Sequence, residues 1–243
     1  MRYKVATWNT QGYNGAKWEQ IKLLLKTSDV VCVQEAGSLA DDDGKCIDGF
    51  WVYGWPGKAT EGNRNSRVSL AIVSRTATNI NGFLPADTRG LAFIVINNVL
   101  YGSWHENRGQ GGLGTALGRM RRDYPDVAPT IQSYIIGGDF NDPSHQAVAV
   151  GSSSRGRVVL TSSDYNLLYS RTKTHKAGTS GTGKVANLDR VYVSSDLTIV
   201  HHWAIDTKLV SDHNPVCAEI VGNTTEMTYW ETFKSKLPWQ GVA

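Results

Sequence analysis

The sequence is poor in cysteine, and this excludes a disulfide framework. Only 3 of its 243 residues are cysteine. This is too few for the even number of closely spaced cysteines whose disulfides stabilise a small secreted fold. Cys32 and Cys217 lie in apolar, strand-like runs and are expected to be small buried thiols. Cys46 lies in the loop "ADDDGKCIDG", where it could be a free surface thiol or pair with another chain.

Long apolar runs are also missing. No stretch approaches the roughly 20 residues that a membrane span requires, so we expect a soluble protein without a membrane span. Met1 is followed at once by "RYKVATWN", which lacks the charged, apolar and small-residue order of a secretory signal. Either the protein stays inside its cell, or this is a mature form from which a signal has been removed.

The composition is that of an ordinary globular domain. Hydrophobic residues make up 40% and charged residues 19% of the chain, and 243 residues can bury well over half of their unfolded surface. The net charge of +3 permits a polyanionic partner without requiring one.

Residues 1–222 contain no repeat or linker and are expected to form one catalytic domain. Residues 223–243 differ, because Asn223, Glu226 and Pro238 are spaced as the cap, capping-box partner and stop of an appended helix.

Strand-like segments recur along the chain, with alternating or β-branched residues typical of a sheet. They are "YKVATW", "DVVCVQ", "FWVYGW", "RVSLAIVS", "LAFIVINNVLYGSW", "SYIIGG", "NLLYS", "LDRVYVS", "LTIVHHWAI" and "PVCAEIV". Two helices are predicted between them from apolar residues that share one face. These residues are Trp18, Ile21, Leu24 and Leu25 in the first helix, and Leu113, Leu117, Met120 and Tyr124 in the second. Many strands and a few helices in one domain predict an α/β fold with two central sheets and helices on their outer faces.

Polar residues stand where the apolar strands end or begin. They are Asn9, Glu35, His105, Asp139, Asn141, Asp189, Asp212 and His213. Side chains at strand ends can gather at one edge of a sheet, and acidic and imidazole groups gathered there would suit metal-assisted hydrolysis of a phosphate ester. Mg²⁺ prefers oxygen ligands and is held by one or two carboxylates, which Glu35 and Asp212 could supply.

The two histidines would carry the proton chemistry. A neutral imidazole can take a proton from water, and a protonated one can hydrogen-bond a phosphoryl oxygen that gains negative charge. Asp189 is a candidate partner for His213, since an aspartate behind a histidine fixes its tautomer. Asn9 and Asn141 could orient phosphate or carboxylates without adding charge. Together these residues predict a phosphodiesterase site.

Short motifs in a fixed order resemble a known superfamily. "TWN", "QE", "WH", "GDFN", "LD" and "SDH" follow one another over residues 7 to 213, in the manner of the endonuclease/exonuclease/phosphatase superfamily. This superfamily includes deoxyribonuclease I, abasic-site endonucleases, inositol-polyphosphate phosphatases and sphingomyelinases. The resemblance implies a four-layer α/β/β/α sandwich, in which two mainly antiparallel sheets are flanked by helices.

Longer segments are similar to the B subunits of cytolethal distending toxins, which are deoxyribonuclease I-like. "VATWNTQG", "VQEAGS", "RVSLAIVSR" and "SDHNPV" carry this likeness, which extends over nearly everything up to residue 222. It implies the following roles: Glu35 and Asp212 as metal ligands, His105 and His213 as catalytic histidines, Asp189 as the partner of His213, Asp139 and Asn141 as groups that position the nucleophile and the phosphate, and Arg67 and Arg89 as contacts to DNA phosphates.

The chain also departs from the toxin subunits. Glu106 follows His105 where they have a small apolar residue, residues 36–66 form a shorter segment, and residues from 223 onward have no counterpart. Delivery, partner subunits and host therefore stay open.

The leading hypothesis is a DNA endonuclease with little sequence preference that depends on Mg²⁺, with Mn²⁺ or Ca²⁺ as alternative ions. By resemblance it would be the catalytic subunit of a genotoxin, secreted and active in the nucleus of a target cell, although an intracellular location stays open. Partners would be DNA and toxin delivery subunits, bound through Cys46 or the C-terminal tail. The alternatives are a phosphatase acting on phosphoinositides or other phosphomonoesters with the same site, and a catalytically silent binding or delivery module.

Overall fold

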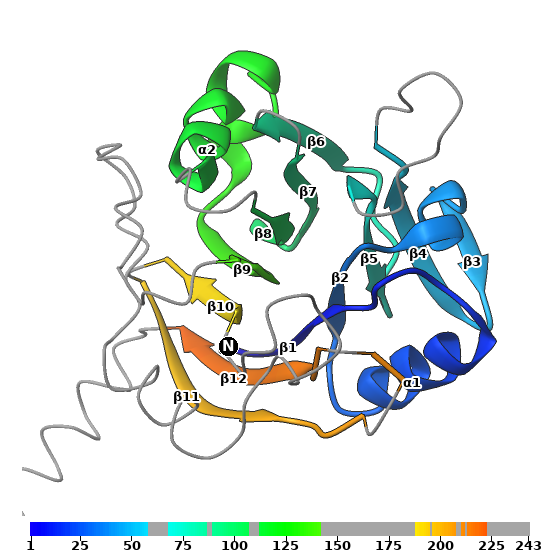
Figure 1. The fold of residues 1–243 in the computed structure, drawn as a ribbon. Helices are drawn as coiled ribbons and strands as arrows, with labels where there is room; N and C mark the ends of the chain where they lie inside the picture. The colour runs from blue at the N-terminus through cyan, green and yellow to red at the C-terminus, as the bar shows by residue number, and fades with distance from the viewer. Residues whose placement is uncertain are drawn as a thin grey trace, which may run out of the picture.

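The computed structural model describes residues 1–57, 68–86, 89–106, 112–141, 188–194, 196–207, 210–211 and 213–222. Two sheets face each other, and a helix covers the outer side of each (Figure 1). The predicted α/β fold, with two mainly antiparallel sheets flanked by helices, is confirmed. Arg67, Asp212, the expected strand "NLLYS" and the expected helix after residue 222 lie outside the described residues.

The larger sheet has seven strands and the smaller has five. The larger runs in the order β11 (Leu197–Ala204), β12 (Val216–Gly222), β1 (Arg2–Asn9), β2 (Val30–Gln34), β5 (Leu70–Ser74), β4 (Phe50–Trp55) and β3 (Lys45–Ile47). The smaller runs in the order β10 (Asp189–Val193), β9 (Ser133–Asp139), β8 (Val99–His105), β7 (Arg89–Ile96) and β6 (Asn81–Ala86). Among the described strand pairs, β1–β2 and β8–β9 are parallel and the others antiparallel.

Alternation along the strands sorts side chains into separate layers, because successive residues of a strand point to opposite faces. On β1, Val5 packs into the core between the sheets, whereas Ala6 and Trp8 pack on the outer side. The helix α1 (Gly15–Leu25) buries Ile21 and Leu24 on that outer side. The layer order is therefore helix, sheet, sheet and helix.

The second helix covers the smaller sheet. Leu113 and Met120 of α2 (Gly112–Asp123) pack with Phe93 and Trp104, which lie on the outer face of that sheet. The apolar stripes read from the sequence thus fall on the buried faces of both helices. Two short 3₁₀ helices complete the described elements, η1 (Gly37–Asp41) and η3 (Ala128–Thr130). No helix in these ranges is long and apolar enough to span a membrane.

One strand-like run of the sequence is two strands in the structure. "LAFIVINNVLYGSW" divides into β7 and β8, which pair antiparallel with Ile96 opposite Val99. The turn between them consists of Asn97 and Asn98, both with positive φ (50° and 64°). Asparagine tolerates this left-handed backbone, which two-residue hairpin turns require. The short strands β3 and β6 were not predicted from the sequence.

Candidate active site

Three polar side chains of the smaller sheet stand in one row. His105 ends β8, Asp139 ends β9 and Asp189 begins β10. The strand register pairs His105 with Asp139, and Asp139 with Asp189. Paired residues of neighbouring strands project to the same face, so all three side chains meet at one end of the sheet.

The larger sheet brings its polar residues to the same end. β1 ends at Asn9, which is paired with Gln34, and Glu35 follows directly. His213 lies shortly before β12, whose first residue, Val216, is paired with Thr7 of β1. The strand ends of both sheets therefore face one another across the site.

Asp139 is the centre of this group. The side-chain nitrogen of Asn9 donates a hydrogen bond to Asp139 Oδ2 over 2.9 Å, and it lies 3.3 Å from Glu35 Oε1. His105 Nε2 is 3.6 Å from Asp139 Oδ2 and 3.9 Å from Glu35 Oε1. His213 Nε2 lies 3.9 Å from the same Asp139 oxygen. The structure thus brings together five residues that the sequence distributes between positions 9 and 213.

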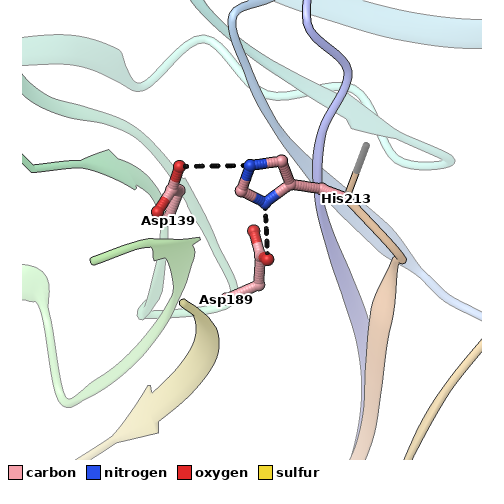
Figure 2. Close-up of side chains that lie close together, drawn as sticks. All are labelled: Asp139, Asp189 and His213. Atoms are coloured by element: carbon pink, nitrogen blue, oxygen red, sulfur yellow. Dashed lines mark hydrogen bonds and ion pairs between the residues drawn. The ribbon is translucent and has the colours of Figure 1, made fainter. Parts of the chain in front are cut away.

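Asp189 orients the second histidine. Its Oδ2 lies 2.7 Å from His213 Nδ1, and Asp189 is only 1% exposed. Figure 2 shows the imidazole between the two aspartates, with Nδ1 toward Asp189 and Nε2 toward Asp139. A carboxylate at Nδ1 holds that nitrogen in its protonated form, which leaves Nε2 as the atom that exchanges a proton.

The pKa of Asp139 is lowered although the residue is buried. Burial alone raises the pKa of this carboxyl, but His213, His105, the Asn9 amide and the backbone N–H of Asn141 together outweigh that effect. Opposite charge and hydrogen bonds to a carboxylate both favour its ionised form. Asp139 is therefore a carboxylate at neutral pH.

Asn141 links two loops at the edge of the site. Its backbone N–H donates to Asp139 Oδ1 over 2.9 Å, and its side-chain nitrogen donates to the carbonyl of Glu106 over 2.9 Å. Its backbone is left-handed, with φ of 46°. Glu106, the residue that departs from the toxin pattern, is 3% exposed, and its N–H donates to the carbonyl of Asp139. The loops after β8 and β9 are thereby tied together.

Two residues that hold His213 in place were missed by the sequence analysis. The indole nitrogen of Trp8 donates to the His213 carbonyl over 3.0 Å. The Ser211 hydroxyl donates to the carbonyl of Asn9 over 2.8 Å and accepts from the N–H of His213 over 3.2 Å. The only sequence signal was their place inside the motifs "TWN" and "SDH", beside the residues that were assigned roles.

Carboxylates suited to a hard divalent cation are present. Ligand atoms of Asp139, Asp189 and His213 all lie within 4.8 Å of one another. However, His213 Nδ1 and Asp189 Oδ2 already bond each other. Glu35 is the more open acid, because its side chain is 15% exposed while those of Asp139 and Asp189 are 2% and 0% exposed. Its carboxylate can thus take a partly hydrated ion, as Mg²⁺ prefers.

The structure describes the backbone of only one of the two predicted arginines, and it does not describe the second predicted metal ligand. Arg67 and Asp212 lie outside the part of the chain that the structure describes. The backbone of Arg89 begins β7 and pairs with Ala86. The next residue, Gly90, pairs with His105, so the backbone of Arg89 lies beside the strand end that carries the first histidine.

The sequence pattern of the Endonuclease/Exonuclease/phosphatase family matches residues 6–213, which include every site residue described above. The chain belongs to this family. It is accordingly a metal-dependent hydrolase of the phosphodiesterase type. No curated protein matches it in sequence.

Several solved structures share the fold. The cytolethal distending toxin of Haemophilus ducreyi is 22% identical with a TM-score of 0.56, over 91% of this chain and 98% of the other. An Endonuclease/Exonuclease/phosphatase family protein of Bacteroides thetaiotaomicron is 16% identical with a TM-score of 0.61, over 92% and 99%. A 3′ phosphatase of Neisseria bound to a product DNA hairpin is 17% identical with a TM-score of 0.56, over 89% and 98%. Identities this low support the fold alone.

Proposed function

We propose that this family member is a Mg²⁺-dependent endonuclease that hydrolyses DNA phosphodiester bonds with little sequence preference. The observation that carries the proposal is the arrangement around the pair His213–Asp189. Nε2 of His213 faces the ionised Asp139, and His105 and Asn9 approach the same carboxylate. A water molecule and a phosphate placed among these groups would meet a base, an acid and hydrogen-bond donors at once.

Each residue then has a defined task. Asp139 and Asn141 orient the attacking water and the phosphate, and His213 takes the proton of the water through Nε2. His105, when protonated, donates a hydrogen bond to the phosphoryl oxygen that gains charge. Asn9 holds the Asp139 carboxylate in place over 2.9 Å.

Glu35, together with Asp212, would hold the Mg²⁺ ion. A bound Mg²⁺ supplies stabilisation of negative charge on the phosphoryl and leaving oxygens. Mn²⁺ or Ca²⁺ could take the same oxygen ligands.

DNA is the substrate class that we propose on grounds of charge. Arg67 and Arg89 would contact DNA phosphates, and the chain carries a net charge of +3. Contacts of this kind are independent of sequence and weaken with salt. The variant Arg89→Ala is therefore expected to bind DNA less tightly and to show a smaller slope of affinity against salt.

We further propose that the protein is the catalytic subunit of a secreted genotoxin that acts in the nucleus of a target cell. The fold likeness to the Haemophilus ducreyi toxin and the motifs shared with toxin B subunits support this. Residues 1–222 would form the catalytic domain, and delivery subunits would bind the tail from residue 223 or Cys46, which is exposed. Loss of complex formation, but not of nicking, on removal of residues 223–243 would support this arrangement.

Nicking of supercoiled plasmid tests the proposed activity. We expect relaxed circles with Mg²⁺, none with a chelator, and a loss of at least about 100-fold in rate for His213→Ala or His105→Ala with DNA binding retained, as expected for loss of proton transfer. Unimpaired nicking by either histidine variant contradicts the catalytic role of that histidine. A folded parent protein that never nicks DNA over a range of salt concentrations contradicts the proposed function.

A phosphatase with the same site is the second candidate, and the fold likeness to the Neisseria 3′ phosphatase favours keeping it. Release of phosphate from inositol phospholipids or from 3′-phosphorylated DNA that far outpaces nicking would support it. A silent binding module is disfavoured, because burying an ionised aspartate beside two imidazoles is costly and such groups concentrate at functional sites.

A further inference from the structure

A polar layer lies between the two sheets, directly below the site. Thr7, Gln34 and Ser103 have no exposed surface. Each points into the space between the sheets, where neighbouring residues of the same strands, such as Val5 and Tyr101, form an apolar core. Burying an amide and two hydroxyls there is favourable only if they are hydrogen-bonded.

These residues form one hydrogen-bonded chain across the interior. Gln34 Nε2 of β2 donates to Ser103 Oγ of β8 over 2.9 Å. Ser103 Oγ donates in turn to the carbonyl of Val33 over 2.9 Å, so the link closes on β2. Thr7 Oγ1 of β1 donates to Gln34 Oε1 over 3.2 Å. The larger sheet is thus fastened to the smaller one at the level of Ser103.

The sheets approach closely at this level. Gly137 of β9 is the strand partner of Ser103. A Cβ added to Gly137 would lie 2.6 Å from Thr7 Cβ and 3.3 Å from Cys32 Cβ. The layer has no room for another side chain, so hydrogen bonds and small residues set the gap between the sheets.

Every member of this layer lies one or two residues along the chain from a site residue. The pairs are Thr7 with Asn9, Gln34 with Glu35, Ser103 with His105, and Gly137 with Asp139. Asn9 and Glu35 belong to the larger sheet, whereas His105 and Asp139 belong to the smaller one. A change in the gap at this level therefore changes the distances across the site itself.

We propose that Gln34 and Ser103 are positioning residues, which hold the two sheets at the separation that brings Asn9 and Glu35 into reach of Asp139 and His105. Apolar contacts are non-directional and allow sheets to shift, whereas a hydrogen bond has an optimum length and direction. The expected loss of turnover rests on the proposed function, but the expected change in the distances across the site does not.

Ser103→Ala and the control Ser74→Ala separate positioning from general stability. Ser74 is also unexposed, but its hydroxyl bonds locally to Thr76, and the residue pairs with Val30 at the far end of the sheet. At a temperature where both are folded, we expect Ser103→Ala to lower the turnover of plasmid nicking about tenfold, with KM for DNA unchanged; a misplacement of about 1 Å can cost roughly 100-fold. Ser74→Ala should keep the turnover of the parent.

Gln34→Met breaks the same hydrogen bond from the other sheet and should by itself lower turnover about tenfold with KM unchanged, so it serves as the test should Ser103→Ala fail to fold. Where both single variants fold, the double variant should be no slower than the slower single variant, because both substitutions break that bond. Independent, multiplying losses in the double variant would overturn the inference.

The side-chain amide of Asn9 gives a readout that does not depend on activity. Its nitrogen resonance, assigned by its loss in Asn9→Asp, should shift and its protons exchange faster with solvent in Ser103→Ala but not in Ser74→Ala. An unchanged Asn9 signal in Ser103→Ala overturns the inference, whether or not the protein nicks DNA. If the parent protein does not nick DNA while Ser103→Ala still shows the Asn9 change, only the proposed function is contradicted.

Discussion

The indole nitrogen of Trp8 donates a hydrogen bond to the carbonyl oxygen of His213, 205 residues further along the chain, over 3.0 Å. Trp8 has no exposed surface and packs on the α1 side of the larger sheet. Ser211 fastens the same loop to Asn9. The strand that carries the first residue of the site therefore also holds the loop that carries the last one.

Trp8→Phe should misplace His213 without unfolding the protein. The ring still fills the outer core, but the His213 carbonyl loses its indole donor and keeps the longer, 3.4 Å bond from the Thr207 hydroxyl. We expect nicking to slow about tenfold, which corresponds to about 1.4 kcal/mol in the barrier. Trp18→Phe is the matched control, because Trp18 bonds Asp48 beside α1. Equal rates for the two variants would refute the role of Trp8.

Asp189→Asn should disable His213 while preserving the shape of the site. An amide in place of the carboxylate can present its NH₂ group to Nδ1, which favours the wrong tautomer and leaves Nε2 protonated. A fall in turnover on the order of 10²- to 10⁴-fold is expected, by analogy with other histidine–aspartate pairs. DNA affinity, measured by fluorescence anisotropy, should stay within about twofold because no phosphate contact is lost. An active Asp189→Asn enzyme would exclude His213 as the base.

Glu35→Gln should weaken metal binding. The substitution keeps a hydrogen-bond acceptor for Asn9 but removes the charge that a divalent cation requires of its ligands. Titration calorimetry should show Mg²⁺ binding weakened at least about tenfold, the range seen when groups that support a metal site are lost. The parent should recover nicking when Mg²⁺ or Mn²⁺ is added after chelation. Parent-like Mg²⁺ affinity in Glu35→Gln would assign the ion to other ligands, with the group Asp139, Asp189 and His213 as the first alternative.

Thiol labelling should distinguish the three cysteines. Burial raises the pKa of the Cys32 thiol to about 12, against a smaller lowering by the backbone of Gly137, and it raises that of Cys217 to about 12. The thiolate is the reactive form, so both should resist maleimide near neutral pH, while the exposed Cys46 reacts. Mass spectrometry should find one label on the native chain and three after denaturation. Rapid labelling of Cys32 in the native state would contradict the packing between the sheets.

The fold was predictable where the chain repeats a simple pattern. Apolar residues at helical spacing placed Ile21 and Leu24 on the buried face of α1, and Met120 on that of α2. The hairpin at Asn97 and Asn98 was missed because the apolar residues on both sides read as one run, although paired asparagines that tolerate positive φ were a usable signal.

The sequence predicted which residues form the site, but not the distances between them. Strand ends with polar residues identified Asn9, His105 and Asp139, since the ends of neighbouring strands must meet somewhere on a sheet. No local pattern shows that Gln34 reaches Ser103 on the other sheet. Such a contact depends on how two sheets stack, which is fixed by residues far apart in the sequence.

The position of β1 between β12 and β2 has a consequence for biosynthesis. Asn9 leaves the ribosome before His213 and the strand that flanks it, which are made roughly two hundred residues later. A domain of this kind folds as a unit once its partner strands exist. A nascent or prematurely terminated chain would then be harmless to the nucleic acids of the cell that makes it.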